Sequence, residues 1–440
     1  MSQAAATRLF GEIARAHTAP FDADCEKLWD YYQGSHKKHM DPILAEAYPK
    51  AMLGGMRLVS KPLVKRIVDT TATLFHKPPV WNLLRDGKPL KKDDLERKVW
   101  DAIDEGSQLN SQCKMTNRGA RRDKTAVMVP AWRGGLLRVD VYRPCQVFVL
   151  LDPSAPGDPK SLKAAMTQSG NGFMLWSRDV YGFFTPREED GQEDKFDISD
   201  PLKTNYVNPY GRIPLTFFYD TPGDDVIAPL DDSIISAQEA VDTLWTVFKW
   251  CMQQGFTLNV VITEGDLDAN LIGGPDRLIK VPGTPDTVKV ERLSAELDPG
   301  GMVEFVVAMT KTDAIMHAAD PGLFSLDNDA FQNALSGVAK EVDRADLMTV
   351  REDDEPDYQY YLADFFDAAR AVHNHHAKTA DALGEDLVLE MEFVKPTSGG
   401  NALQDAQAEQ IRIDNGTATV EEIRAERARA AGKEVEDPDG

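Results

Sequence analysis

Two helices of similar length, separated by a short β-rich stretch, constrain the fold of this chain more than any other feature of its sequence. From Ile234 to Cys251 apolar residues recur at spacings of three and four, which predicts a helix over 231–254 with one apolar stripe. A second helix is expected from Asp298-Pro299, an N-cap residue followed by proline at the first helical position, to Asp320. Three strands are expected between the helices, at Thr257–Thr263, Leu278–Val281 and Thr287–Leu293. The sequence therefore predicts a helical hairpin that carries a small β domain at its tip.

The residues before this hairpin change from a helical to a β pattern. Helices come first, and the last of them, over Met56–Phe75, is expected to end at Pro78-Pro79. After a charged helix around Asp93–Glu105, five short strands are predicted, at Thr125–Pro130, Leu136–Tyr142, Gln146–Leu151, Phe173–Trp176 and Tyr181–Phe184. The acidic stretch Arg187–Asp200 is expected to be an exposed loop. The turn Asn208–Pro214 then leads into a buried strand.

The residues after the hairpin are expected to be mostly helical. A loop, Gly322–Ala330, leads into a long helical region over 331–382 that is interrupted near Pro356. Leu387–Val394 is expected to be a strand, and a short capped helix over Glu421–Ala431 precedes a disordered tail. The overall class predicted is α+β.

The net charge of −23, from 49 basic and 72 acidic residues, limits how this chain can handle nucleic acid. A protein that grips DNA normally presents a basic surface, because phosphate neutralisation supplies most of the affinity. The chain therefore either has nothing to do with DNA or handles DNA without holding it. No apolar run reaches membrane-spanning length and the N-terminus has no signal pattern, so we expect the chain to stay in the cytoplasm where it is made and to have no membrane partner.

The four cysteines do not form a recognisable metal or disulfide motif. Cys25, Cys113, Cys145 and Cys251 lie far apart in the sequence, with no C-x-x-C spacing. Structural zinc and a disulfide framework are both unexpected, and buried or idle thiols are the favoured interpretation.

Three histidines, His373, His375 and His376, raise the question of a metal site. His373 and His376 share one side of a helix, and three carboxylates lie nearby in sequence, at Asp364, Asp367 and Glu385. No position for a third ligand can be identified, so packed or solvated histidines are favoured. The acidic run Glu352–Glu355 lacks the spacing of a calcium loop and is interpreted as a solvated helix break.

No sequence motif favours an enzyme. The glycine-rich turns at Gly273-Gly274-Pro275 and after Asp298 lack the lysine and the strand–loop–helix context of a nucleotide site. There is no G-x-S-x-G motif. We therefore expect no catalytic activity, no metal and no cofactor.

Four passages, in this order and spacing, make the chain resemble the portal proteins of tailed bacteriophages, with siphovirus portals closest in pattern. They are Leu63–Asp69 with Phe75-His76-Lys77-Pro78-Pro79, Asn208-Pro209-Tyr210-Gly211-Arg212-Ile213-Pro214, Asn333–Ala339, and Arg412–Gly416 with Glu421–Arg424. The second is similar to the Asn-Pro-(aromatic)-Gly-Arg-(Ile/Val)-Pro turn that precedes the first stem helix of such portals. The resemblance covers roughly residues 25 to 430.

The resemblance implies a portal fold with a mixed α/β wing, a two-helix stem, a small β-rich clip and a long helix behind a channel loop. The implied divisions are an N-terminal region and wing (1–230), a stem helix (231–254), a clip (255–298), a second stem helix (299–321), a channel loop (322–330), a long kinked helix (331–382), a wing strand (383–400), and a short C-terminal helical region with a disordered tail (401–440). That last region is shorter than the crown of larger portals, which puts a full crown in doubt.

The resemblance also implies a role in the virion. It implies a dodecameric ring at one capsid vertex, through which double-stranded DNA passes during packaging and ejection. The implied partners are the major capsid protein, the large terminase and a head-tail adaptor protein. The alternatives are another ring or scaffold assembly protein of a phage, or a metal-dependent enzyme that uses His373 and His376.

Two groups of residues would carry this role. The resemblance places the channel loop beside DNA, with candidate residues Leu323, Phe324, Asp327, Asn328 and Asp329. Stem packing is expected from Ile234, Val241, Leu244 and Phe248 on the first helix and from Val306 and Met309 on the second. The stripe Ile234–Cys251 is too apolar to be exposed on a monomer, so we expect assembly into a large ring.

Overall fold

The computed structural model describes residues 9, 11–13, 19–155, 157–170, 172–186, 196–198, 207–255, 260–262, 290–292, 299–317, 319 and 345–394. The chain divides into two compact units, one of Met1–Phe324 with Leu347–Val394 and one of Ser325–Asp346 with Lys395–Gly440. Apart from residues 345 and 346, all of the described residues belong to the first unit.

After the helical residues 9 and 11–13 come α2 (Ala19–Gln33), α3 (Lys37–Ala47), α4 (Lys50–Leu53) and α5 (Leu63–Thr71). α2 and α5 pack against each other and share a hydrophobic core cluster that includes Leu28, Tyr31 and Val64. The expected helix over Met56–Phe75 is shorter at both ends. It begins after Pro62 because proline disfavours helical backbone in the residue before it.

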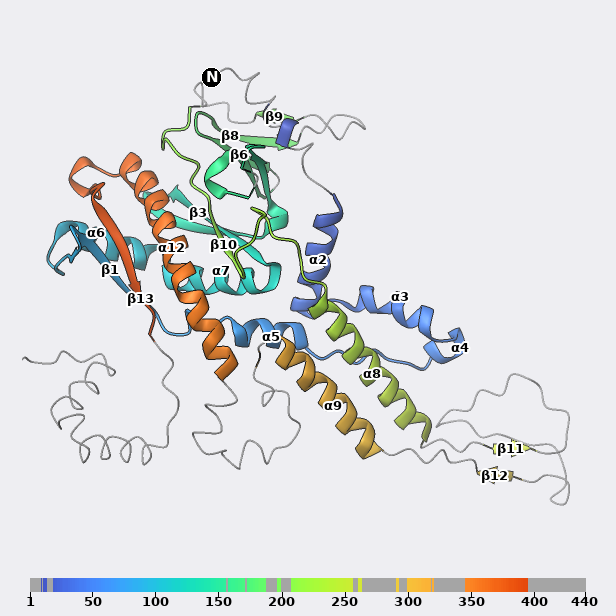
Figure 1. Ribbon diagram of the computed structural model, residues 1–440. Coiled ribbons are helices and arrows are strands. Elements are labelled where there is room, and N and C mark those ends of the chain that lie inside the picture. Colours follow the sequence, from blue (N-terminus) through green and yellow to red (C-terminus); the bar gives the residue numbers. More distant parts are fainter. Residues whose placement is uncertain are drawn as a thin grey trace, which may run out of the picture. The chain divides into compact units, whose positions relative to one another are not determined.

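Antiparallel sheets form the centre of the described unit (Figure 1). A five-stranded meander contains β5 (Val147–Leu151), β6 (Leu162–Ser169), β7 (Gly172–Ser177), β8 (Tyr181–Pro186) and β9 (Phe196–Ile198). A second sheet has the order β10 (Thr216–Tyr219), β3 (Thr125–Arg133), β4 (Leu136–Tyr142), and a third has the order β13 (Leu387–Glu392), β1 (Val80–Arg85), β2 (Lys88–Pro89). A separate pair joins β11 (Val260–Ile262) to β12 (Val290–Arg292).

All five strands predicted between residues 125 and 184 are present, as β3, β4, β5, β7 and β8. Part of the acidic stretch Arg187–Asp200 is not loop, because its residues 196–198 form β9 and pair with β8. β1, β2 and β6 have no counterpart among the expected strands. β1 pairs with β13, about three hundred positions away, so local pattern does not reveal it. In the stretch between the two long helices, β11 and β12 lie within two of the three expected strands, and Leu278–Val281 lies outside the described residues.

Three further helices, α6 (Leu95–Ser107), α7 (Leu109–Asp123) and α12 (Ala345–His376), complete the main core. This core packs Trp100 of α6 with Phe366 of α12, and Phe218 of β10 with Tyr358 of α12. The sequence did not predict α7, because this helix is polar and buries Thr116 and Asn117 in addition to apolar residues. Such a mixture leaves no apolar period to detect.

The expected interruption of the long helix near Pro356 is wrong, because α12 continues through that residue. Proline removes one hydrogen bond of the helix and crowds the turn before it, but strong packing on both sides can hold the helix together. After Pro356 the side chains of Tyr358, Leu362 and Phe365 are buried in the main core. Before it, the buried Arg351 guanidinium donates to the carbonyls of Thr73 and Val394.

Candidate functional site

The helix pair formed by α8 (Ser233–Gly255) and α9 (Pro299–Met316) is the most distinctive part of the described structure (Figure 1). The expected helix over 231–254 is present as α8. The second helix begins at Pro299 as expected but ends at Met316, short of Asp320. It ends there because the Ala319 N–H turns back to donate to the Ala314 carbonyl, 2.8 Å away, which closes the last turn.

The six side chains expected to pack this helix pair lie at different depths. Ile234, Val241 and Val306 are buried, whereas Leu244, Phe248 and Met309 are half-buried. Ile234 and Val241 contact the cluster that contains α2 and α5 rather than a core of the helix pair alone. The N-terminal half of α8 is therefore held by the N-terminal helices of the chain. Its C-terminal half has apolar side chains with accessible surface.

α8 also has a buried polar stripe, which the apolar spacing did not reveal. Gln238, Asp242 and Thr246 are each one helical turn apart, and all three are at most 1% exposed. Asp242 lies off the apolar stripe, as the spacing predicted, yet it is fully buried. A buried carboxylate is costly unless it is paired and hydrogen-bonded, so its partners define its role.

These polar side chains bind the backbone of residues 59–64. Thr246 Oγ1 accepts from the Val59 N–H at 2.9 Å, and Asp242 Oδ1 accepts from the Lys61 N–H at 2.8 Å. Gln238 Oε1 accepts from the N–H groups of Leu63 and Val64, at 2.8 and 3.1 Å. Those two groups belong to the first turn of α5, where a helix leaves its N–H groups without internal partners. The Gln238 side chain of α8 thus caps the N-terminus of α5, although the two helices are far apart in the sequence.

His36 completes this network, which we call the α8 anchor: His36, Gln238, Asp242, Thr246 and the backbone of residues 59–64. The His36 imidazole Nε2 lies 2.7 Å from Asp242 Oδ2 and 3.1 Å from Ser60 Oγ. The Tyr31 ring stacks on His36 with centroids 4.4 Å apart. His36 is 1% exposed. The α8 anchor therefore connects α8 to α2, α3 and the chain leading into α5, and its four side chains are at most 1% exposed.

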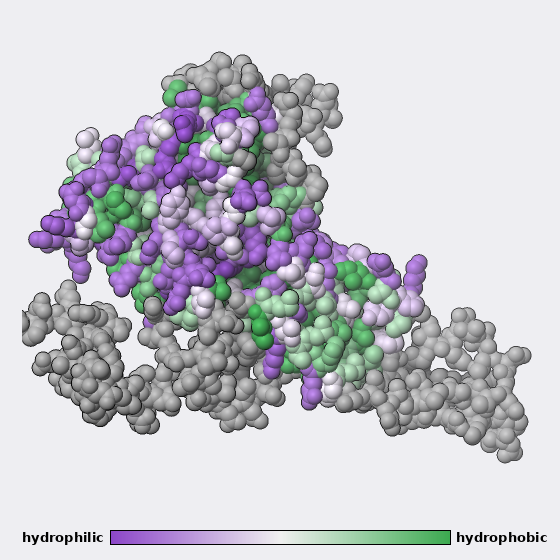
Figure 2. Space-filling view, viewed as in Figure 1, coloured by the Kyte–Doolittle hydropathy of each residue, from purple (hydrophilic) through white to green (hydrophobic). Residues whose placement is uncertain are grey.

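One side of α9 is largely apolar and accessible. Phe305, Ile315 and Met316 of α9 are 57%, 55% and 75% exposed. Phe305 and Met316 are three helical turns apart and face the same way, and Ala308 and Thr312 between them are also exposed. Figure 2 shows apolar residues gathered over α8 and α9, while hydrophilic residues dominate the rest of the visible described surface. We call Phe305, Ala308, Thr312, Ile315 and Met316 the α9 face.

A charged cluster joins α7 and β10 to α12. The Arg121 guanidinium contacts the carboxylates of both Asp220 and Asp354, and Lys124 lies 2.7 Å from Asp220 and 3.7 Å from Asp231. We call these five residues the Arg121 cluster. The helix break expected at the acidic run Glu352–Glu355 is wrong, because α12 continues through it. Glu352 and Asp353 are exposed as expected, whereas Asp354 is 12% exposed and ion-paired. Arg121, Lys124, Asp220 and Asp231 line a cavity of about 240 Å³, and His317, just after α9, also lines it.

Burial makes Asp354 sensitive to pH. Desolvation raises the pKa of this carboxyl to about 6, and Arg121 offsets that effect only in part. Since the folded-state pKa lies above the usual value of 3.8, the contribution to stability is fully present below about pH 3.8 and is lost as pH rises through about 6. We expect Asp354→Asn to be more stable than the wild type near pH 7.5, with the Tm difference disappearing towards pH 4. A Tm difference that does not change with pH would contradict this expectation.

The turn Asn208–Pro214 is held by a single buried amide. Asn208 Nδ2 donates to the carbonyls of Ser177 and Arg212, at 2.6 and 2.9 Å, and its Oδ1 accepts from the Tyr210 N–H at 2.9 Å. Gly211 has a φ of +68°, which glycine adopts without strain. Arg212 is 2.7 Å from Asp364 of α12. Asn208, Gly211 and Arg212 thus each stabilise the turn in a different way. Asp364 forms an ion pair with Arg212.

The histidines at the end of α12 contact neighbouring side chains and backbone. His373 is buried and its Nε2 lies 3.0 Å from the Asp381 carbonyl. His376 stacks on Trp132 with centroids 5.3 Å apart, and its Nε2 lies 3.0 Å from the Tyr210 hydroxyl. Within the described residues no group of three or more His, Cys, Asp or Glu side chains is arranged to hold a metal ion.

The candidate channel residues Leu323, Phe324, Asp327, Asn328 and Asp329 lie outside the described residues, as do the passages Asn333–Ala339 and Arg412–Arg424. Among the residues that are described, no helix has both the length and the apolar character needed to cross a membrane.

Comparisons with known proteins gave matches among solved structures. No protein-family model and no curated protein matches the sequence. A chain from the neck of an empty gene transfer agent particle, computed with C6 symmetry, has a TM-score of 0.47 at 12% identity, over 86% of this chain and 93% of that chain. A chain from the neck of the native particle, computed with C12 symmetry, has a TM-score of 0.44 at the same identity and coverage.

Proposed function

We propose that this chain is one subunit of a phage-type portal protein, a ring at one capsid vertex that conducts double-stranded DNA during packaging and ejection. In this proposal the ring is a dodecamer, α8 and α9 are its stem, and the protein is a structural component of the virion rather than an enzyme. The large terminase, a head-tail adaptor protein and the major capsid protein would be its partners.

The α9 face is the observation that carries the proposal. A monomer in water gains nothing from exposing Phe305, Ile315 and Met316 on one side of a helix, and a contiguous apolar patch usually marks an interface. The α8 anchor holds α8, the neighbour of α9, by buried hydrogen bonds. The helix pair therefore presents the α9 face in a fixed orientation. A closed ring covers the face on every subunit, because each copy packs against the next.

The acidic character of the chain supports a conduit rather than a clamp. With a net charge of −23, the average surface repels phosphate. Screening limits this repulsion to a Debye length of about 10 Å at 0.1 M salt, so it acts on DNA that is already inside a ring and not on distant DNA. The resemblance of Asn208–Pro214 to the turn before the first stem helix of portals adds support, since this turn lies shortly before α8 in the chain.

Assembly gives a direct test. Native mass spectrometry of the purified wild-type chain should show one dominant species of about twelve subunits. Met316→Asp should reduce that species at least about tenfold at micromolar concentration, because a carboxylate would be buried in each interface. Met115→Asp is the matched control, since Met115 also lies on a helix, α7, and is 50% exposed. This control should assemble like the wild type.

A wild-type chain that stays monomeric at micromolar concentration would refute the proposal. The purified chain could form rings while particles assembled without it still package DNA. That result would instead favour another ring or scaffold protein.

A further inference from the structure

An aromatic-lined cavity of about 360 Å³ lies between the second sheet and the five-stranded meander. β3 contributes Trp132, β7 contributes Trp176 and β8 contributes Tyr181, whereas Tyr210 comes from the turn before β10 and His376 from the end of α12. We call these five residues the aromatic pocket. Trp132, Tyr181 and Tyr210 are half-buried, so each ring packs against the main core and keeps accessible surface. A cavity of this size with aromatic lining is typical of a binding site.

The rings form two groups that are joined by one hydrogen bond. In the first group, Trp176 packs on Tyr181 with ring centroids 4.5 Å apart, and Tyr210 lies 6.2 Å from Trp176. In the second group, His376 stacks on Trp132 with centroids 5.3 Å apart. The Tyr210 hydroxyl lies 3.0 Å from His376 Nε2 and joins the groups. The pocket is therefore ordered before anything binds, which lowers the entropic cost of binding.

The strands that carry these rings already have a neighbour on both sides. β3 lies between β10 and β4, and β7 and β8 are both internal strands of the meander. A ligand must therefore bind through its side chains rather than extend a sheet. A polyproline II segment suits such a site, because its backbone makes no internal hydrogen bonds and its rings dock in aromatic-lined grooves. A helix would need a longer groove that takes side chains from several turns.

The charged rim of the pocket is mostly basic. Arg133, His375 and His376 line it and are exposed, and Asp140, the acidic residue of the lining, already contacts Arg133. A surface ion pair of this kind contributes little, so Arg133 can turn to a ligand carboxylate at small cost. Screening to about 10 Å at 0.1 M salt makes this rim, rather than the acidic surface further away, decide which charge docks. The rim therefore complements an acidic ligand, although the chain has a net charge of −23.

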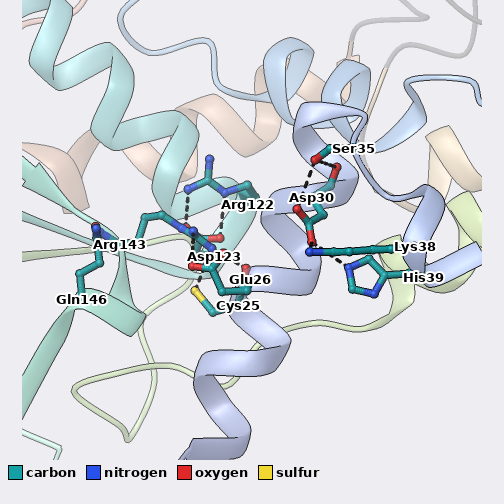
Figure 3. A network of polar contacts seen from close by, with 10 residues as sticks. All are labelled: Cys25, Glu26, Asp30, Ser35, Lys38, His39, Arg122, Asp123, Arg143 and Gln146. Atoms are coloured by element: carbon teal, nitrogen blue, oxygen red, sulfur yellow. Dashed lines mark hydrogen bonds and ion pairs between the residues drawn. The ribbon is translucent and has the colours of Figure 1, made fainter.

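Another half-buried tryptophan, Trp29, is covered by the chain itself. Arg122 and Arg143 lie over its ring, with the guanidinium carbons 4.4 and 4.8 Å from the ring centroid. Asp123 contacts both guanidiniums, and Figure 3 shows these three charged side chains in one network. Trp132, in contrast, borders the cavity of the aromatic pocket. Trp29 is therefore a matched control for substitutions in the pocket.

We propose that the aromatic pocket binds a proline-rich segment of a partner protein that carries a carboxylate next to its prolines. The proline rings lie against Trp132 and Tyr210, and the carboxylate pairs with Arg133. Because proline fixes its own backbone torsion, the segment loses little conformational freedom on binding. A basic segment fits less well, since it would meet Arg133 and two histidines at the rim.

Fluorescence anisotropy of a labelled peptide tests this proposal on the intact chain. The probe is a short fluorescein-labelled peptide of consecutive prolines with glutamate at each end. It should bind saturably, and the same peptide with alanine in place of proline should bind at least about tenfold more weakly. A lysine-flanked proline peptide should also bind more weakly, because Arg133 would repel it.

Single substitutions locate the binding to the pocket. Trp132→Leu keeps an apolar side chain but removes the ring, and it should weaken binding at least about tenfold. Trp29→Leu should bind the probe like the wild type. Arg133→Gln should weaken binding of the glutamate-flanked peptide about two- to fivefold and leave a glutamine-flanked peptide unaffected. If Trp132→Leu fails to fold, as judged by its Tm, Tyr210→Leu takes its place.

Three results would overturn the proposal. They are equal binding of the proline and alanine peptides, equal affinities of Trp132→Leu and Trp29→Leu for the probe, and tighter binding of the lysine-flanked peptide, which would show that the pocket takes a cation instead. Peptide binding can be measured whether or not the chain forms rings. Its failure is therefore distinct from failure of the proposed portal role.

Discussion

Replacing Asp242 by alanine is expected to destabilise the attachment of α8 by about 3–5 kcal/mol, because it removes one partner from a fully buried pair. The imidazole of His36 and the N–H of Lys61 would each lose a partner, at 2.7 and 2.8 Å, and both His36 and Asp242 are at most 1% exposed. Loss of a hydrogen bond is costly when the remaining group is buried. The effect should therefore be much larger than that of removing an exposed carboxylate.

Hydrogen exchange offers a local measurement of this loss. The amides of Val59, Lys61 and Leu63 should exchange at least about a hundredfold faster in Asp242→Ala. Asp242→Asn should be milder, since the amide oxygen can still accept from Lys61. The matched control is Asp41→Ala, whose carboxylate is 57% exposed and 3.9 Å from Lys37. A surface pair of this kind contributes about 0–1 kcal/mol. Equal effects of Asp242→Ala and Asp41→Ala would mean that the α8 anchor does not hold the helix.

Replacing Arg121 by methionine is expected to cost about 3–5 kcal/mol near pH 7.5, because it leaves a buried carboxylate without its cation. Asp220 would still have Lys124 at 2.7 Å, but the ion pair that Asp354 makes is with Arg121. The loss should shrink as the pH is lowered towards 5, since protonation of Asp354 removes the uncompensated charge.

A second substitution should reverse much of the Arg121→Met defect. In Arg121→Met/Asp354→Leu both members of this ion pair become apolar while Asp220 keeps Lys124 at 2.7 Å, and such replacements of whole ion pairs are often neutral. Arg133→Met is the matched control, because Arg133 pairs with Asp140 at the surface and is 57% exposed. Urea unfolding of the four proteins at two pH values measures the difference. A double variant less stable than Arg121→Met alone would show that the cluster has a role beyond charge compensation.

Local pattern was sufficient where an element is determined by its own residues. The strand Leu136–Tyr142 has the bounds that its alternation predicted, and α8 occupies the range expected from its apolar spacing. Pro299 begins α9 because proline suits the first helical position. In each case the signal and the structure lie within one short segment.

Pattern failed where a residue serves a distant partner. Pro356 was expected to break a helix that the core instead keeps whole. Asp354 was expected to be solvated, but it forms a largely buried ion pair with Arg121, which lies more than two hundred positions away in the sequence. These outcomes depend on non-local contacts, whose energies no local period encodes.

The sequence by itself determined the acidic character of the chain, the hairpin of two helices around a β-rich stretch, and the apolar stripe from Ile234 to Cys251. Charge and periodicity are properties of composition and order, so they need no fold to be evident. Only the tertiary structure decided which face of α8 is buried, because Gln238 and Asp242 become core residues by accepting from the N–H groups of Leu63 and Lys61, more than 170 positions away. It also left Phe305 and Met316 uncovered on α9, because a side chain's burial depends on what packs over it and not on its own hydropathy.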